Sequence, residues 1–139
     1  MTMAFSAPLQ RALYERLTTA PALSALGGRV FDEAPHRSLA AADAPYATIG
    51  DETVAPWETA TERGAVHEAM VRLHAPARGF LALKALAAAV SDEIEANPPT
   101  PETGRVVSAR FISARTAREA DGALRRIDLR FRFVLEDEL

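Results

Sequence analysis

A regular alternation of apolar and charged residues near the C-terminus, between Ala123 and Glu136, constrains the fold more than any other feature. The apolar set is Ile127, Leu129, Phe131, Phe133 and Leu135, and it alternates with the charged set Arg126, Asp128, Arg130 and Arg132. Because successive side chains of a strand point to opposite faces of a sheet, this period of two predicts a long strand. One of its faces must lie in a hydrophobic core, and the other meets water or a partner.

Three earlier segments also have the residue types and alternation of strands: 45–53, 65–75 and 106–115. In the last of these, Val107, Ala109 and Phe111 are predicted to share one face. A brief extended piece begins at Arg29. The Asp121-Gly122 pair before the final strand is typical of a tight turn, which joins the last two strands as a hairpin.

Two segments carry the spacing of amphipathic helices. Leu9, Leu13 and Leu17 recur every fourth residue after Ser6-Ala7-Pro8, where Ser6 can cap a helix start. The stronger pattern runs from 79 to 96 and ends before two prolines.

The order of these segments favours an α+β fold. We expect a two-layer domain with an antiparallel sheet of about four strands and two main helices packed on one face, with a mixed sheet as the alternative. A long loop over 54–64 separates two of the strands. No internal repeat or linker divides the chain, so residues 1–139 are predicted to form one domain.

Composition excludes several classes of function. The net charge is −3, which gives no overall attraction to nucleic acid or to an anionic membrane. There is no cysteine, so disulfides, thiol catalysis and thiolate metal sites are excluded, and a reducing cytosol suits the chain. No apolar run approaches the ~20 residues of a membrane helix, and the N-terminus lacks a signal-peptide apolar block, which argues against export.

No catalytic, metal or cofactor site is expected. The three histidines are His36, His67 and His74. His67 and His74 lie seven residues apart on one predicted strand, so they face opposite ways and cannot share a metal within a chain. No glycine-rich phosphate loop and no serine, histidine and acid constellation is present.

Basic side chains gather on the polar face of the predicted sheet: Arg72, Arg110, Arg126, Arg130 and Arg132. They could contact nucleic acid, but the aromatic residues Phe131 and Phe133 belong to the opposite face and Asp128 interrupts the row. Cross-strand or cross-subunit ion pairs with Glu68 and other carboxylates are the favoured interpretation. This face and the open sheet edges are suited to association with another chain.

The loop over 54–64 holds the only tryptophan, Trp57, in a polar setting that is too long for an ordinary hairpin. Because tryptophan is enriched at interfaces, we expect this loop to lie at an interface. Its candidate residues are Pro56, Trp57, Glu58, Thr59, Thr61, Glu62 and Arg63. The alternative is that Trp57 folds back onto its own domain.

The ordered set of these motifs resembles the tail terminator (tail completion) family of long-tailed phages, prophages and gene transfer agents. The matching stretches are Leu13–Leu17, Gly27–Asp32, Pro45-Tyr46, Thr48–Gly50, Trp57–Thr59, Gly64, His67, Lys84–Val90, Val107–Phe111 and Leu129–Phe133. The sequence departs from the pattern at His74-Ala75-Pro76, where the family leads us to expect a bulky aromatic residue.

The resemblance implies a structural virion protein, not an enzyme. Such proteins form a hexameric ring on the finished tail tube at the tail-neck junction, and the loop over 54–64 would lie at an interface or line that ring. The ring stops tube polymerisation, meets the neck or stopper protein, and lets DNA pass without sequence-specific binding. Assembly takes place in the bacterial cytoplasm, with no cofactor and no membrane.

Two alternatives stay open at this stage. One is another head–tail connector or stopper, which shares size and simple α+β character. The other is a small oligomeric ligand-binding domain or enzyme, which should show a defined cavity with convergent polar groups in one protomer.

Overall fold

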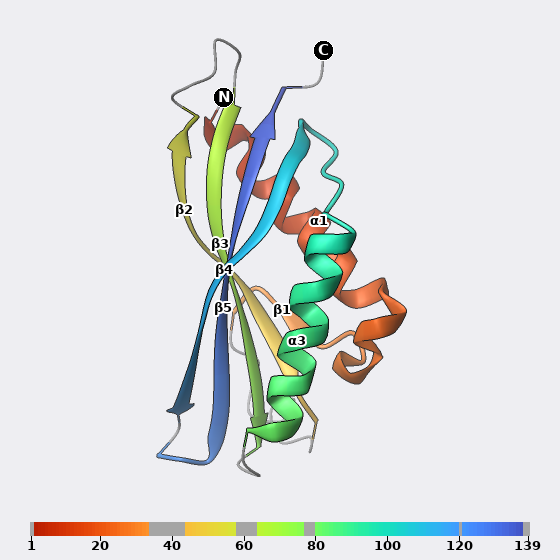
Figure 1. Cartoon of the computed structure of the whole chain (residues 1–139), viewed down its shortest axis with the longest axis vertical. Coiled ribbons are helices and arrows are strands. Elements are labelled where there is room, and N and C mark those ends of the chain that lie inside the picture. Colours follow the sequence, from red (N-terminus) through yellow and green to blue (C-terminus); the bar gives the residue numbers. More distant parts are fainter. Residues whose placement is uncertain (1, 34–43, 58–63, 77–79, 120, 138–139) are drawn as a thin grey trace.

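The computed structural model describes residues 2–33, 44–57, 64–76, 80–119 and 121–137. Its elements are η1 (Thr2–Phe5), α1 (Ser6–Thr19), η2 (Pro21–Leu26), β1 (Val30–Phe31), β2 (Tyr46–Pro56), β3 (Gly64–Pro76), α3 (Leu81–Ala96), β4 (Arg105–Glu119) and β5 (Leu124–Glu136). The fold is α+β, as predicted, with both main helices covering the same side of the sheet (Figure 1).

The sheet has five strands in the order β1-β2-β3-β5-β4. The four long strands pair antiparallel, whereas the two-residue β1 pairs parallel to Ala47 and Thr48 of β2. The sheet is therefore mixed, and β1 is the strand that raises the expected number from about four to five. Residue Asp121 has φ 55 and Gly122 has φ 86, so the predicted Asp-Gly turn does join β4 to β5.

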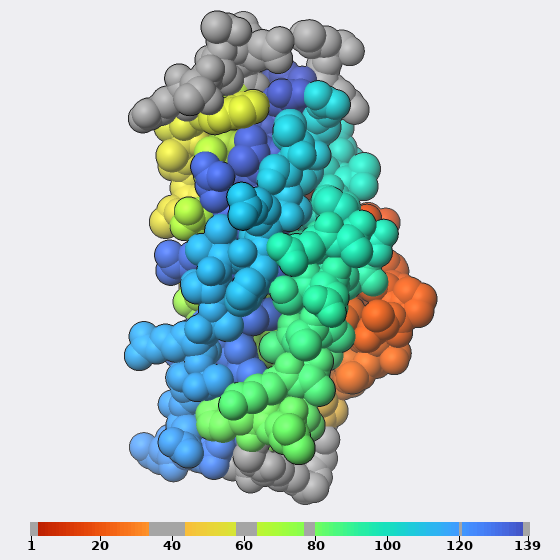
Figure 2. Space-filling view, viewed as in Figure 1, coloured from red at the N-terminus to blue at the C-terminus, as the bar shows by residue number. Residues whose placement is uncertain are grey.

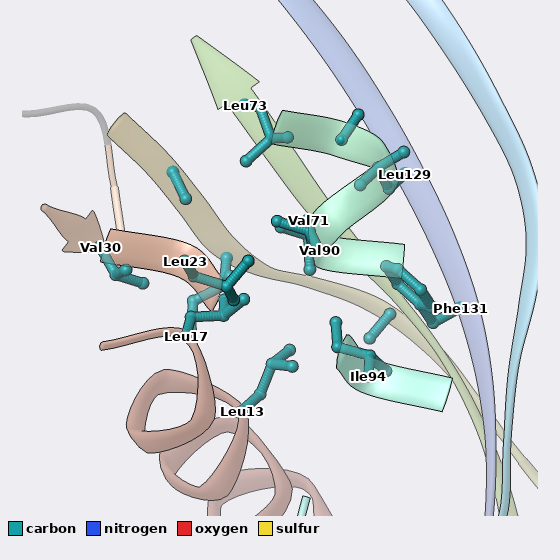
Figure 3. Packing of buried hydrophobic residues seen from close by; sticks show 14 of the residues in the cluster. Leu13, Leu17, Leu23, Val30, Val71, Leu73, Val90, Ile94, Leu129 and Phe131 are labelled. Carbon is teal, nitrogen blue, oxygen red and sulfur yellow. The ribbon is translucent and has the colours of Figure 1, made fainter. Parts of the chain in front are cut away.

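The core lies between the sheet and the two helices. The alternating apolar residues of β5 are all buried, as their period predicted, and Phe131 and Phe133 are fully enclosed. Leu13 and Leu17 of α1 face Val90 and Ile94 of α3 across this core (Figure 3). Burying an apolar side chain of this size stabilises the fold by about 1.5–3 kcal/mol, so the packed apolar layer holds the helices to the sheet.

Several predicted boundaries differ from the structure. β2 extends to Pro56, beyond the predicted end at Thr53, and β4 extends to Glu119, beyond Arg115. β4 also contains a bulge between its pairs at Val106 and Ser108. The bulge shifts the alternation, so Val106 packs on the core while Val107, expected beside Ala109 and Phe111, is 47% exposed.

The start of α1 also differs from expectation. Ser6 is the first helical residue and makes no capping hydrogen bond; its hydroxyl donates to the Glu52 carboxylate of β2 instead. Phe5 precedes it and is fully buried. Among the described residues, no helix is long and apolar enough to cross a membrane.

Candidate assembly surface

Trp57 lies at the base of the connection between β2 and β3. Its backbone N–H donates to the Gly64 carbonyl at 3.1 Å, which extends the pairing of the two strands. A Cβ built on Gly64 would meet Trp57 Cε3 at 2.6 Å, so the indole lies directly over this glycine. Trp57 is partly buried. The ring of Trp57 therefore contacts its own domain, and the expected place of the loop at an interface stays a prediction.

The connection is shorter than the predicted loop over 54–64, because Val54, Ala55 and Pro56 belong to β2. Of the seven candidate loop residues, Pro56 is exposed at the end of β2 and Trp57 follows it. The remaining five lie outside the described residues: Glu58, Thr59, Thr61, Glu62 and Arg63.

The predicted arginines do share the polar face of the sheet, since cross-strand registers place Arg72 beside Asp128 and Arg110 beside Arg132. Three of the five are ion-paired within the chain. Arg72 contacts Asp51 and lies 3.5 Å from Asp128, and Arg130 lies 3.7 Å from the predicted partner Glu68.

Arg126 is the most heavily paired of the set, at 2.8 Å from Asp128 and 3.2 Å from Glu119. Burial alone would lower the pKa of Arg126, but the hydrogen bonds and charges of Asp128 and Glu119 reverse this and raise it. Among the described residues, Arg110 and Arg132 form no ion pair within the chain. Most of the arginine row is thus neutralised internally, which argues against an open basic surface for phosphate.

A buried polar cluster interrupts the expected wet face of the sheet. His74 is 6% exposed and stacks on Tyr46 with ring centroids 4.5 Å apart. Its Nε2 lies 2.9 Å from Thr48 Oγ1, and its Nδ1 lies 2.5 Å from Glu119 Oε1. An ionised Glu119 can only accept, so Nδ1–H donates to it and the threonine hydroxyl donates to Nε2.

Burial dominates the titration of this cluster. Desolvation lowers the pKa of His74 below its ordinary value, although the Glu119 carboxylate acts in the opposite direction. Desolvation, followed by the charge of Glu119, raises the pKa of Tyr46. The register of β2 and β3 places Tyr46 and Thr48 on the same face as His74, and Glu119 reaches this face from β4.

His67 faces the core, opposite to His74 as predicted, and is fully buried. Its Nδ1 lies 3.1 Å from Glu52 Oε2, and its Nε2 has no hydrogen-bond partner in the described part of the chain. Both described histidines are therefore buried polar residues. His36 lies outside the described residues.

The free edge of the sheet at β4 exposes apolar side chains that sequence patterning did not identify as a surface. Phe111 is 37% exposed and Ile112 is 45% exposed, near the exposed Val107. A second bulge, between the pairs at Phe111 and Ser113, turns Ile112 outward. Figure 2 shows β4 lying on the surface beside α3.

The described residues offer little for substrate chemistry. No group of three or more His, Asp or Glu side chains among them could hold a metal ion. One hollow of about 310 Å³ lies against α1 and is lined by Arg11, Tyr14, Glu15 and Glu102 among others. Neither described histidine lines it.

The same fold is also found in a virion. The chain is similar to a chain of the solved structure "Virion of native gene transfer agent (GTA) particle", with a TM-score of 0.79 and 36% sequence identity over 92% of this chain and 94% of that one. The domain is therefore that of a structural particle component.

The particular family follows from the sequence match. Residues 11–136 match the family described as tail completion protein gp17, and the chain belongs to that family. It is thus a structural tail completion protein of phage or gene transfer agent type and not an enzyme, in agreement with the resemblance noted in the sequence. The comparison with curated proteins gave no match.

Proposed function

We propose that this protein forms a closed hexameric ring on the finished end of the tail tube. The ring stops the addition of tube subunits and presents a different surface to the neck or stopper protein. The family membership of residues 11–136 is the observation that carries this proposal. The likeness to a chain of a gene transfer agent virion supports it.

Termination of a polymer is a matter of differential binding. The ring must bind the tube end as another tube ring would, and it must not offer the same surface on its far side. A ring of identical subunits achieves this when each subunit uses two different patches and the rotation closes. The domain has two unlike sheet edges, β2 with β1 on one side and β4 on the other, which suits such a heterologous contact.

DNA in transit should pass through the ring without being held. A net charge of −3 per chain disfavours tight phosphate binding and the counterion release that accompanies it. The internal pairing of Arg72, Arg126 and Arg130 further reduces free positive charge. We therefore expect Glu58 and Glu62 to lie nearer the channel than the arginine row.

The test is tail length in particles assembled with and without this chain, measured by negative-stain electron microscopy. Without it, overlong tails or tails not joined to heads are expected, and the native chain should restore normal length. Labelled protein should lie at the junction below the head. Normal tails without the chain, or its absence from that junction, would overturn the proposal.

Trp57→Ala tests the loop. We expect it to weaken ring formation or tail capping while the monomer stays folded. The reason is that the change alters the base of the loop, which under this proposal lies at an interface. Trp57→Phe keeps an aromatic ring over Gly64 and serves as the matched control. Circular dichroism confirms folding, and native mass with tail tube protein reports ring formation. Unchanged assembly, or loss of the folded monomer, would contradict the role given to Trp57.

A further inference from the structure

The β4 edge of the sheet combines exposed apolar residues with positive charge. All of residues 110–116 are exposed, and they include Phe111, Ile112, Arg110 and Arg115. Arg110 and Arg115 form no ion pair with any described residue. Glu95 of α3 accepts a hydrogen bond from the Phe111 N–H at 3.0 Å, so one amide of this edge is already occupied.

The opposite edge of the sheet has the complementary character. Within the described residues β1 pairs only with Ala47 and Thr48, which leaves the Gly50–Pro56 segment of β2 without a strand partner on its outer side. This segment contains two carboxylates and no basic residue. Glu52 is turned to Ser6 and the buried His67, so Asp51 is the carboxylate that a neighbouring subunit can reach. The Asp51 side chain is 69% exposed, and the segment ends in exposed apolar residues at Ala55 and Pro56.

The registers place these two edge segments at the same level of the sheet. Thr53 pairs with Glu68, which pairs with Arg132, which pairs with Arg110. The next row runs from Glu52 to Phe111 in the same way. A neighbour displaced sideways along these rows therefore brings its acidic segment to the basic, apolar part of β4.

Strand direction is also compatible with this contact. The four long strands alternate in direction, so β2 and β4 at the two ends run antiparallel. When a second copy is rotated about an axis parallel to the strands, its strands keep their direction. β4 of one copy then meets β2 of the next copy antiparallel, which is the favoured pairing. A symmetric contact between two β4 strands would instead bring Arg110 and Arg115 against arginines of the same strand.

We propose that the β4 edge between Val107 and Ile112 docks the Gly50–Pro56 edge of a second copy of this chain. The inference rests on the proposed ring and specifies its subunit contact. Opposite charges and the two apolar patches supply the recognition. The bulges in both strands and the missing N–H of Pro56 interrupt the backbone ladder, so side chains carry most of the contact.

The absence of cysteine allows a direct test by disulfide cross-linking. Thr53→Cys and Arg110→Cys are made as separate proteins, mixed in equal amounts with tail tube protein, and oxidised. Heterodimers are expected from the mixture, and a ladder of multimers is expected from the double variant. Arg115→Cys replaces Arg110→Cys as the control, because it removes the same charge about 16 Å away along the strand and should not cross-link.

Native mass and electron microscopy of the same mixtures separate the two proposals. A ring on the tube without a disulfide between positions 53 and 110 would overturn this contact and leave the proposed function intact. Dimers from Arg110→Cys alone would indicate a symmetric contact and would also overturn it. Failure to form any ring on tube ends, with the native chain included, would overturn both.

Discussion

Trp57 lies against Gly64, and the two residues are joined by a backbone hydrogen bond of 3.1 Å. A Cβ at position 64 would meet the Trp57 ring at 2.6 Å and the Leu135 carbonyl at 3.1 Å. The only tryptophan of the chain therefore needs a glycine beneath it. This contact fixes the ends of β2 and β3 relative to each other.

Gly64→Ala should destabilise the fold by about 1–3 kcal/mol, because the added methyl group overpacks a site bounded by the indole and by backbone. Chemical denaturation followed by circular dichroism measures the loss, and the fluorescence of Trp57 should change as the ring is displaced. In a Trp57→Ala background the same substitution should cost less, since the ring contact is lost and only the contacts with the Leu135 carbonyl and with the Cβ of residue 57, at 3.2 Å, remain. Equal costs in both backgrounds would show that the two residues are not coupled.

Glu52→Ala should lower stability by about 1–3 kcal/mol, because it removes the hydrogen-bond partner of a buried ring nitrogen of His67. The same substitution also removes the acceptor of the Ser6 hydroxyl, which ties α1 to β2. Asp51→Ala is the matched control one residue away. Its ion pair with Arg72 is exposed, and the expected cost is about 0–1 kcal/mol. If urea denaturation shows similar losses of stability for both variants, the hydrogen bond between Glu52 and His67 does not stabilise the fold as expected.

The parts of the fold that the sequence predicted are those with uninterrupted periodicity. β5 alternates without a break, so its buried face followed from the pattern alone. The stripe of α3, which includes Leu83 and Ile94, gave the buried helix face in the same way. The identity of the family also followed from sequence, because its motifs lie in order along nearly the whole chain.

The features that escaped prediction depend on residues far apart in sequence. The brief extended piece predicted from Arg29 is β1, but two residues give no periodic signal, and its parallel pairing with Ala47 is visible only in three dimensions. A bulge adds one residue to a strand, so the alternation around Val107 pointed to the wrong face. The hydrogen-bond partner of the buried His74 is Glu119, which lies 45 positions away. The exposed apolar surface of β4 was missed because the second bulge, between the pairs at Phe111 and Ser113, turns Ile112 outward.

The lowered pKa of His74 predicts a loss of stability on mild acidification. The folded state disfavours the charged ring, so between the unfolded pKa of about 6.5 and the lower folded pKa the unfolded chain binds more protons. Stability from this group is full above about pH 6.5 and falls as pH drops below it, with a slope of up to about 1.4 kcal/mol per pH unit.

Urea denaturation at several pH values between 7.5 and 5 measures this slope for the native chain and for His74→Gln. Carboxylates titrate in both proteins, so the difference between the two slopes isolates His74. The variant should show a flatter dependence just below pH 6.5 and a lower stability at pH 7.5, where the contacts to Thr48 and Glu119 are weakened. Identical slopes would mean that His74 does not titrate differently in the folded state.

Phe5→Ala should be among the most damaging substitutions, with a cost of about 3–5 kcal/mol, because Phe5 is fully buried. Met3→Ala, two residues earlier and 65% exposed, is the control and should change stability by less than about 0.5 kcal/mol.

The Phe5 ring also fills the space above Gly104, where a Cβ would lie 2.4 Å from the ring. Gly104 has φ 76, so Gly104→Ala combines backbone strain with this clash.

The two effects at Gly104 can be separated in a double variant. Removing the ring with Phe5→Ala relieves the clash but not the strained backbone, so Gly104→Ala should cost less in that background and should still cost something. Thermal denaturation followed by circular dichroism measures all four proteins. If Gly104→Ala loses the same stability with and without the Phe5 ring, then the backbone conformation alone requires a glycine at this position. No cost in the Phe5→Ala background would assign it to the aromatic contact that joins the start of α1 to the sheet.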